Sequence, residues 1–204
     1  RRSRQTIGRR VRLRYRDTLA ALAQRLDCGR PMRVLFEATR WRSTRFKLSL
    51  PWQDALMPLL NKTYGRVVFV ASGSGTAAFD GSSAAIRKKV REAKTRDALH
   101  AIADAFVQSA EAGSHEQAGF PSSCYGVSKM LTIRYSQLLA EEAPEGVLVN
   151  SMCPGWVATD MTRGQGDRTP AEGAATAVEL ATLPDGTVEP RGAMLRDMQE
   201  VGWE

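Results

Sequence analysis

Short apolar runs and helix-like periodicities alternate along the chain from about residue 54. The runs at residues 67–71 and 146–150 are rich in β-branched residues and are bounded by turn residues, which is typical of strands buried on both faces of a sheet. Residues 192–195 predict a last strand, and residues 33–35 are compatible with the start of an earlier one. The pattern therefore indicates a sheet of short, fully buried strands.

Helices are predicted between these strands, and each has a recognisable start. Residues 83–112 place apolar side chains on one helical face, with Thr95 suited to be an N-cap. A second helix is predicted from about Ser123 until Pro144, which blocks its extension. Thr169 opens a third, with Pro at the first helical position and Glu completing a capping box. Strands that alternate with helices predict an α/β fold, a parallel sheet with helices on both faces.

The length of 204 residues suits one domain with a sizeable core, so we expect a single domain over residues 1–204. Within it, residues 1–53 are a divergent basic segment and residues 54–204 carry the orderly pattern. No stretch approaches 18 consecutive apolar residues, so no membrane span is expected.

The chain has an odd number of cysteines, and their spacing does not suit a metal site. Cys28, Cys124 and Cys153 fit a reducing cytoplasm, where each thiol is expected to act as a small buried hydrophobe.

The net charge of +7 is unevenly distributed. Residues 1–47 carry fourteen Arg and one Lys against three carboxylates, a net charge of +12, so the remaining residues carry −5. Such a segment can bind nucleic acid through phosphates, which leaves a nucleic-acid-binding protein acting through residues 1–47 as one alternative. The arginines are scattered rather than aligned on one face, however, so we expect no nucleic-acid partner.

The spacing Tyr125-Gly-Val-Ser-Lys129 carries the clearest chemistry. On a helix, residues four apart lie on the same face, so the two side chains can act together. An ammonium near a phenol favours the phenolate, and a phenol tuned in this way can protonate a carbonyl oxygen that receives a hydride. Because such a pair often occurs by chance, a surface tyrosine beside a solvated lysine remains the alternative for this spacing alone.

Two further polar positions follow predicted strands. Ser72 comes directly after residues 67–71, and Thr159 belongs to a loop that turns at Pro154-Gly155 after the strand at residues 146–150. Ligands of open α/β sheets bind outside the carboxyl ends of the strands, so a hydroxyl at Ser72 can donate to a developing oxyanion. Ordinary turn residues are the alternative at both places.

The chain resembles the short-chain dehydrogenase/reductase family, and more narrowly cytosolic NADPH-dependent carbonyl reductases. The resemblance covers residues 54–204 and rests on three stretches in order. These are Gly-Arg-Val-Val-x-Val-x-Ser ending at Ser72, Pro-Ser-Ser-x-Tyr-Gly-Val-Ser-Lys ending at Lys129, and Val-Asn-x-x-Cys-Pro-Gly-Trp-Val-x-Thr-Asp-Met ending at Met161.

The resemblance implies a Rossmann-like doubly wound parallel sheet and a role for each site residue. Tyr125 is the implied proton donor, Lys129 favours the phenolate and holds the nicotinamide ribose, and Ser72 orients the substrate carbonyl. Trp156 is implied to line the substrate pocket. The residues implied to contact the nicotinamide side of the cofactor are Pro154, Gly155, Val157 and Thr159.

The implied reaction is hydride transfer from NADPH, which becomes NADP+, to a small-molecule carbonyl compound: an aldehyde, a ketone or a quinone. The implied enzyme is a cytoplasmic monomer. The 53 residues from Ser72 to Tyr125 form a long gap for the family, and the extra helical segment in it is implied to cover the usual dimer face.

Departures from the family pattern lie in the first part of the sequence. No Gly-rich pyrophosphate turn precedes Ser72, and Phe36-Glu-Ala-Thr-Arg-Trp41 stands where Asn-Asn-Ala-Gly is expected. An inactive remnant without the dinucleotide-binding turn is therefore a further alternative, in which the strand at residues 67–71 would lack ladder partners.

One Gly-rich stretch follows Ser72 and matches the dinucleotide fingerprint. We interpret the stretch that begins Gly73-Ser-Gly75 as a loop rather than a pyrophosphate site, because Asp80-Gly81 interrupts it and a true fingerprint opens a helix at once.

Overall fold

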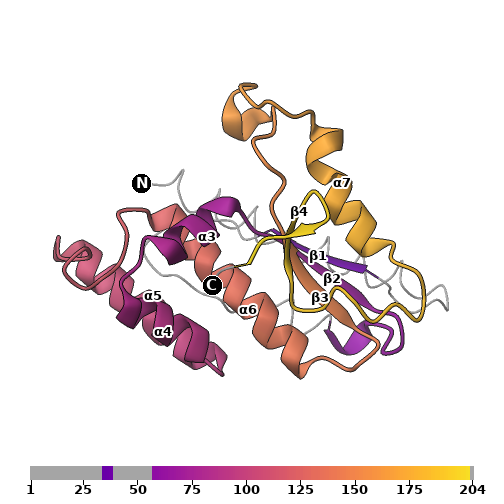
Figure 1. The fold of residues 1–204 in the computed structure, drawn as a ribbon, viewed down its shortest axis with the longest axis horizontal. Coiled ribbons are helices and arrows are strands. Elements are labelled where there is room, and N and C mark those ends of the chain that lie inside the picture. Colours follow the sequence, from indigo (N-terminus) through magenta and orange to yellow (C-terminus); the bar gives the residue numbers. More distant parts are fainter. Residues whose placement is uncertain (1–33, 39–56, 203–204) are drawn as a thin grey trace, which may run out of the picture. The chain divides into compact units, whose positions relative to one another are not determined.

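A five-stranded sheet forms the centre of the computed structural model, which describes residues 34–38 and 57–202 (Figure 1). All of these residues belong to one compact unit, Arg33–Glu204. The strands lie in the order β1 (Val34–Ala38), β2 (Arg66–Val70), β3 (Leu148–Met152), β4 (Met194–Arg196) and β5 (Gln199–Glu200). The first four are parallel to their neighbours, and β5 is antiparallel to β4.

Helices fill the connections between the strands. They are α3 (Gly73–Asp80), α4 (Ala84–Glu92), α5 (Arg96–Glu111), α6 (Cys124–Glu142) and α7 (Pro170–Ala181), with short 3-10 helices at Met57–Leu59 and Asp160–Thr162. Among the described residues no helix combines the length and the apolar character that a bilayer crossing needs.

The faces of β2 show that the sheet is doubly wound. Phe69 meets Tyr135 of α6 edge to face, with ring centroids 5.8 Å apart. Its neighbours Val68 and Val70 point to the other face, where they pack in one apolar cluster with Leu180 of α7. Because successive side chains of a strand alternate between faces, α6 and α7 cover opposite sides of the sheet. The predicted α/β class is therefore confirmed.

Most predicted elements exist, with shifted ends. The three later strands begin and end within two residues of the predicted runs. Thr95 and Thr169 cap α5 and α7, and Ser123 caps α6 by accepting a hydrogen bond from the Gly126 amide. The predicted helical segment at residues 83–112 is two helices, because Thr95 starts a second one after α4.

The expectation that the strand after residue 65 lacks ladder partners is wrong. β2 pairs with β3 on one side and with β1 on the other, with Leu35 opposite Val67 and Glu37 opposite Phe69. β1 falls within the basic segment at residues 1–53, so at least this part of the segment belongs to the sheet.

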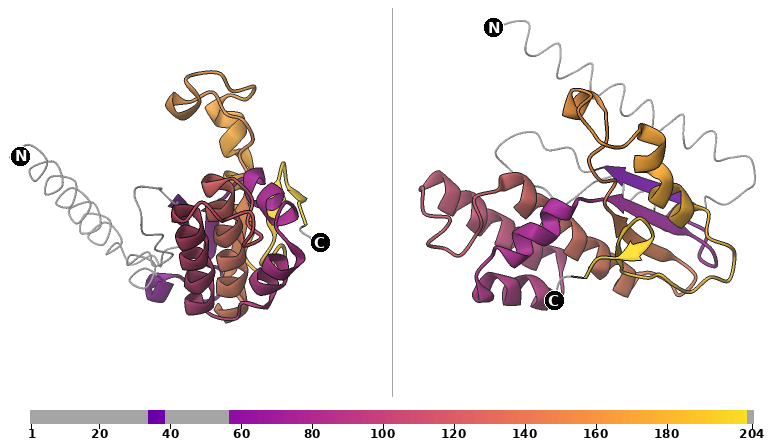
Figure 2. Two further views of the ribbon diagram at one scale, coloured as in Figure 1. Left: turned by 90° about the vertical axis from the view of Figure 1, so that its left-hand side faces the viewer. Right: turned by 45° about the horizontal axis from the view of Figure 1, so that its top comes forward.

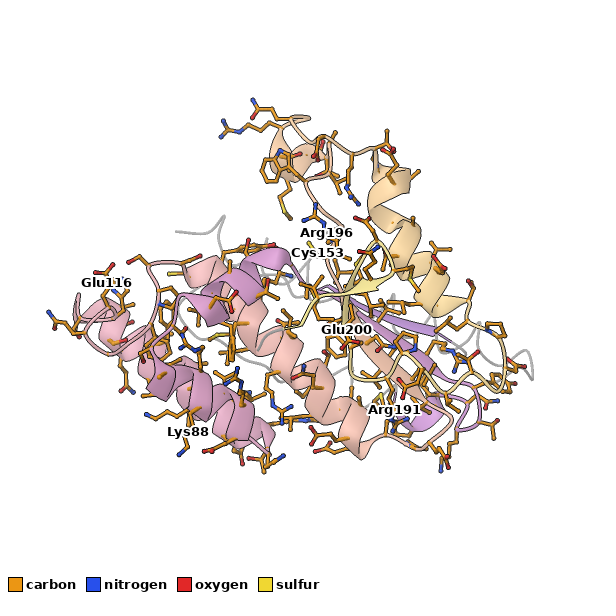
Figure 3. All side chains as sticks on the ribbon, viewed as in Figure 1. Lys88, Glu116, Cys153, Arg191, Arg196 and Glu200 are labelled. Atoms are coloured by element: carbon orange, nitrogen blue, oxygen red, sulfur yellow. The ribbon has the colours of Figure 1, made fainter. Side chains whose placement is uncertain are left out.

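Two arginines close the end of the sheet opposite the site described below. The buried Arg66 donates to the carbonyl oxygens of Gly65 at 3.0 Å and Pro184 at 2.7 Å. Arg191 lies beside the C-terminal end of α6 (Figure 3) and donates to five carbonyls there, including Ala140 at 2.6 Å. A fixed guanidinium fork can satisfy several orphan carbonyls at once.

The cysteines differ in exposure, which corrects the expectation that all are buried. Cys153 is buried at the end of β3, whereas Cys124 is exposed at the start of α6, and both are free thiols. Cys28 lies outside the described residues.

Candidate active site

Ser72 lies where the chain leaves β2 and enters α3. Its backbone is extended, and its Oγ accepts a hydrogen bond from the Ser74 amide at 3.2 Å, so Ser72 is the N-cap of α3. The interpretation of the Gly-rich stretch as a loop is wrong, because the helix begins at Gly73. Ser72 is thus held at the carboxyl end of β2 by the cap, and Ser74 belongs to the first turn of the helix.

Tyr125 and Lys129 lie in the first two turns of α6 and share one face, as their spacing predicts. The Lys129 Nζ atom lies 5.8 Å from the centroid of the Tyr125 ring. Tyr125 is 48% exposed, whereas Lys129 is 7% exposed. The ammonium donates to the carbonyl oxygen of Val70 at 2.9 Å, which ties α6 to the last residue of β2, two positions before Ser72.

Glycines allow α3 and α6 to approach closely. A Cβ built on Gly75 would lie 2.7 Å from the Lys129 carbonyl carbon, and one on Gly126 would lie 2.9 Å from the Ser74 carbonyl oxygen. The side of α3 that carries Gly75 therefore faces α6. The start of α3, which follows Ser72, lies against the start of α6, which carries Tyr125. Ser72, Tyr125 and Lys129 gather in this way at one edge of the sheet.

The contact between α3 and α6 argues against a phosphate site at the Gly-rich stretch. In a dinucleotide fingerprint the second glycine lets the backbone approach the pyrophosphate. Here the space beside Gly75 is filled by backbone atoms of α6, and the Ser74 amide is bonded to the Ser72 hydroxyl. The packing of two helices accounts for this glycine, which supports the interpretation that the stretch is no pyrophosphate site.

The connection from β3 to α7, residues 153–169, is called the β3–α7 arm. It starts beside Ser72: the Ala71 amide donates to the Met152 carbonyl at 2.8 Å, and the Cys153 sulfur lies 3.8 Å from a Cβ built on Gly73. Pro154 and Gly155 follow, both half-buried, and Gly155 has a φ of +78°, which favours glycine. The arm thus leaves the sheet at the edge where the other candidate residues gather.

Local contacts hold the next three residues of the arm that the sequence predicts to belong to the site. The Trp156 indole donates to the Gln165 carbonyl at 2.8 Å, although 57% of the residue is exposed. Val157 presses its methyl groups on Gly173 of α7, where no Cβ would fit. Thr159 is exposed, and its amide donates to the Thr162 hydroxyl at 3.0 Å. The tip of the arm extends away from the sheet in both views of Figure 2.

Arg168 and Asp197 form an ion pair that sequence reasoning missed. The guanidinium donates two hydrogen bonds to the carboxylate, at 2.5 and 2.7 Å. The hydrogen bond from Arg168 lowers the pKa of Asp197, and the amide of Thr169 likewise lowers the pKa of Glu172. The partners of the pair are 29 positions apart, and no spacing rule connects an arm residue with a turn after β4.

A second polar cluster missed by sequence reasoning precedes α6. The Ser122 hydroxyl lies 2.8 Å from Nε2 of His115 and donates to the Glu116 carboxylate at 2.5 Å. Glu116 therefore bonds the hydroxyl rather than the imidazole, which differs from a triad in which the carboxylate orients the histidine. No group of three potential metal ligands occurs among the described residues.

Comparisons with known proteins identify similar enzymes, although no protein-family model matches the chain. The chain is 37% identical to carbonyl reductase [NADPH] 3 of Rattus norvegicus, over 90% of this chain and 68% of that protein. It is 38% identical to carbonyl reductase [NADPH] 1 of the same organism, over 72% of this chain and 55% of that protein. The first match covers more than residues 54–204, so the similarity includes part of the basic segment.

Among solved structures, salutaridine reductase from Papaver somniferum matches with a TM-score of 0.62 and 29% identity. The match covers 70% of this chain and 49% of that one, so the chain spans about half the length of this neighbour.

Proposed function

Because this chain belongs to the short-chain dehydrogenase/reductase family and to its carbonyl-reductase group, we propose that it reduces small carbonyl compounds with NADPH. The candidate substrates are aldehydes, ketones and quinones. The observation that carries the proposal is the placement of Lys129, whose ammonium lies close to the Tyr125 ring while it is bonded to the end of β2.

The described residues fit one end of the cofactor. Hydroxyl and ammonium groups of Ser72, Tyr125 and Lys129 gather at the carboxyl ends of parallel strands, where nucleotides bind in such sheets. Lys129 would hold the nicotinamide ribose, and the backbone at Pro154 and Gly155 would flank the ring. NADPH supplies the hydride. Among the described residues the only Gly-rich helix start is that of α3, so the pyrophosphate turn is not assigned to any of them.

The proposed chemistry uses the exposed phenol of Tyr125. Its hydroxyl gives a proton to the carbonyl oxygen as the carbonyl carbon gains the hydride, which yields an alcohol. The Lys129 ammonium stabilises the phenolate that remains, since opposite charges close together favour the charged form. The Ser72 hydroxyl donates to the same oxygen and orients the substrate. Trp156 is proposed to border the pocket from the arm.

From the relatives we infer only the class of substrate, small carbonyl compounds. We propose a monomer that acts in the cytoplasm on small molecules. The role of Val157 in holding the nicotinamide is proposed for its backbone groups, because its side chain packs on α7. The role of Thr159 is proposed for its hydroxyl, because its amide is bonded to the Thr162 hydroxyl.

Tyr125→Phe tests the proposal. It removes the proton donor and keeps the ring, so we expect NADPH oxidation with a quinone substrate to fall by about a hundredfold or more. NADPH affinity, titrated by fluorescence, should change little. Tyr64→Phe makes the same chemical change before the amino end of β2 and should leave the rate unchanged. If Tyr125→Phe retains a tenth of the activity, another group donates the proton.

The alternatives predict different results. An inactive remnant would neither bind NADPH nor reduce a quinone. A nucleic-acid-binding protein would shift DNA or RNA with a steep dependence on salt concentration.

A further inference from the structure

We propose that Arg168 and Asp197 form a clamp that fixes the β3–α7 arm over the carboxyl edge of the sheet and so positions the residues that hold the nicotinamide. The inference rests on the proposed function, because it assigns the pair a role in that site. Neither residue is a catalytic group. Both act through the backbone of the arm.

Arg168 holds the arm with its backbone and its side chain. Its amide donates to the Trp156 carbonyl at 3.1 Å, and its own carbonyl accepts from the Ala158 amide at 2.8 Å. These two bonds make a short parallel bridge between Val157 and Arg168. The side chain then passes over Gly155, where a Cβ would come within 2.8 Å of Cδ and Nε. The outgoing and returning halves of the arm therefore meet at Arg168.

Asp197 anchors the other end of the clamp on the sheet. Asp197 and Met198 form the two-residue turn between β4 and β5, with φ values of 53° and 58°. Two successive positive φ angles define the hairpin turn that matches the strand twist and favours Asp or Asn. The turn follows β4, in which the buried Leu195 accepts a hydrogen bond at its carbonyl from the Cys153 amide at 2.8 Å. The carboxylate is thus carried by the strand that also bonds the first residue of the arm.

The geometry of the pair suits a positioning role. Two parallel hydrogen bonds between a guanidinium and a carboxylate fix orientation as well as distance. The Arg168 side chain is only 24% exposed, and Asp197 is half exposed. Arg196 also lies near the carboxylate, with its Nε 3.7 Å from Oδ2, but it belongs to β4 rather than to the arm. Arg196 therefore provides a matched control for the loss of a cation beside Asp197.

Hydrogen exchange of the full chain tests the clamp. We compare Arg168→Gln, Asp197→Asn, the double variant and the control Arg196→Gln. Asn suits the left-handed turn at position 197, so Asp197→Asn removes the charge without straining the hairpin. We expect peptides within residues 154–166 to exchange at least about threefold faster in both single variants, with no further gain in the double variant. Peptides of α6 and Arg196→Gln should match the wild type.

Kinetics extend the test to the proposed role. In both single variants the KM for NADPH should rise several-fold, whereas the KM for the quinone should change less. Arg168→Lys keeps the charge and loses the paired geometry, so it should restore the KM only in part. A simple loss of folding would instead speed exchange in α6 as well.

Two results would overturn the clamp: unchanged exchange in the arm of both single variants, or faster exchange with an unchanged KM for NADPH. If the wild type shows no reductase activity at all, the proposed function fails. Exchange in the arm still decides whether the pair clamps it.

Discussion

Lys129 is buried and also carries the charge that is proposed to act on Tyr125, and burial and charge usually conflict. A buried ammonium is costly unless it is hydrogen-bonded, and here the Val70 carbonyl supplies the bond at 2.9 Å. The same bond holds Nζ near the Tyr125 ring, at the carboxyl ends of the strands. Sequence spacing predicts that Tyr125 and Lys129 share a face, because helix periodicity is a local property. It does not predict which strand receives the ammonium.

Ser72→Ala should lower activity strongly, whereas Ser74→Ala should be mild. Ser72 lies at the carboxyl end of β2 and its hydroxyl is proposed to orient the substrate, and Ser74 is an exposed residue of the first turn of α3. Loss of the N-cap also lowers the free energy of unfolding by about 1 kcal/mol. The measurement pairs quinone reduction with thermal unfolding.

A matched variant separates the two effects of Ser72→Ala. Ser83 caps α4 by accepting from the Ile86 amide at 3.3 Å, and it has no role in the proposed chemistry. Ser83→Ala should therefore cost a similar amount of stability with normal activity. Equal activity losses in Ser72→Ala and Ser83→Ala would contradict the role of the Ser72 hydroxyl.

At the scale of elements, local sequence rules predicted the caps and the strands but not the contacts. Thr95 and Thr169 were predicted as caps because a cap side chain bonds an amide three residues ahead, which needs no knowledge of the fold. Helix α3 was missed, since its two early glycines disfavour a helix in isolation. Packing on α6 overrides that preference. Arg191 meets the five carbonyls that it binds, within residues 140–147, only in the folded chain, because it follows them by 44 to 51 positions.

Gly75→Ala should destabilise the protein. The added Cβ would meet backbone atoms of Lys129 and Met130 at 2.7 and 2.8 Å, which cannot move without shifting α6. Overpacking of this kind costs about 1–3 kcal/mol in the free energy of unfolding, measured by denaturant titration. Gly73→Ala is the control in the same helix, because its Cβ would find only the Cys153 sulfur at 3.8 Å. Equal stability of the two variants would show that α3 and α6 are less tightly packed than described.

The β3–α7 arm should loosen in acid because of Asp197. Its pKa is lowered chiefly by the hydrogen bond from Arg168, with further attraction from Arg168 and Arg196. The ordering that the bond provides is therefore complete above the ordinary pKa of an aspartate, about 4, and is lost as the pH falls through the lower pKa of the folded state. Hydrogen exchange, corrected for its intrinsic pH dependence, should show this loss in residues 154–166.

Asp197→Asn is the reference for that measurement. Glu172, whose pKa is also lowered by bonds from Thr169, lies in the first turn of α7 next to the arm. It is present in the wild type and in Asp197→Asn alike. Only the difference between wild type and Asp197→Asn reports the clamp. A difference that stays constant from pH 6 down to about pH 2 would contradict the assignment.

At the scale of the whole molecule, the described sheet gathers the proposed catalytic residues at one edge, and the buried Arg66 and the partly buried Arg191 close the opposite end. Parallel strands bring the ends of β2 and β3 together, so residues more than 50 positions apart in sequence meet there. The fold class followed from the alternation of strands and helices. The pairing of β1 with β2 could not be read in this way, because a five-residue strand within an arginine-rich segment has little pattern of its own.

We expect the protein to be a monomer in solution. The resemblance implies that the helical segment between Ser72 and Tyr125 covers the usual dimer face, and the structure builds α4 and α5 from it. In a two-fold dimer the same surface patch meets its copy, so a contact centred on α4 would bring the two copies of this helix together. α4 carries Arg87, Lys88, Lys89 and Arg91 against one carboxylate, so two copies would repel each other, and lysine is depleted at stable interfaces.

Sedimentation at micromolar concentration tests the monomer and should give the mass of one chain, both at low salt and at about 0.5 M salt, where charge repulsion is screened. The high-salt condition matters because α4 and α5 border an apolar groove. Two copies of the chain could associate through this groove once the charge repulsion is screened. The groove is lined by Ile86, Ala101, Ile102 and Phe120. Ala101→Asp places a charge in that groove. It should leave the sedimentation unchanged if the chain is a monomer. A dimer or tetramer that Ala101→Asp dissociates would show that copies of the chain meet through α4 and α5 and would overturn the prediction.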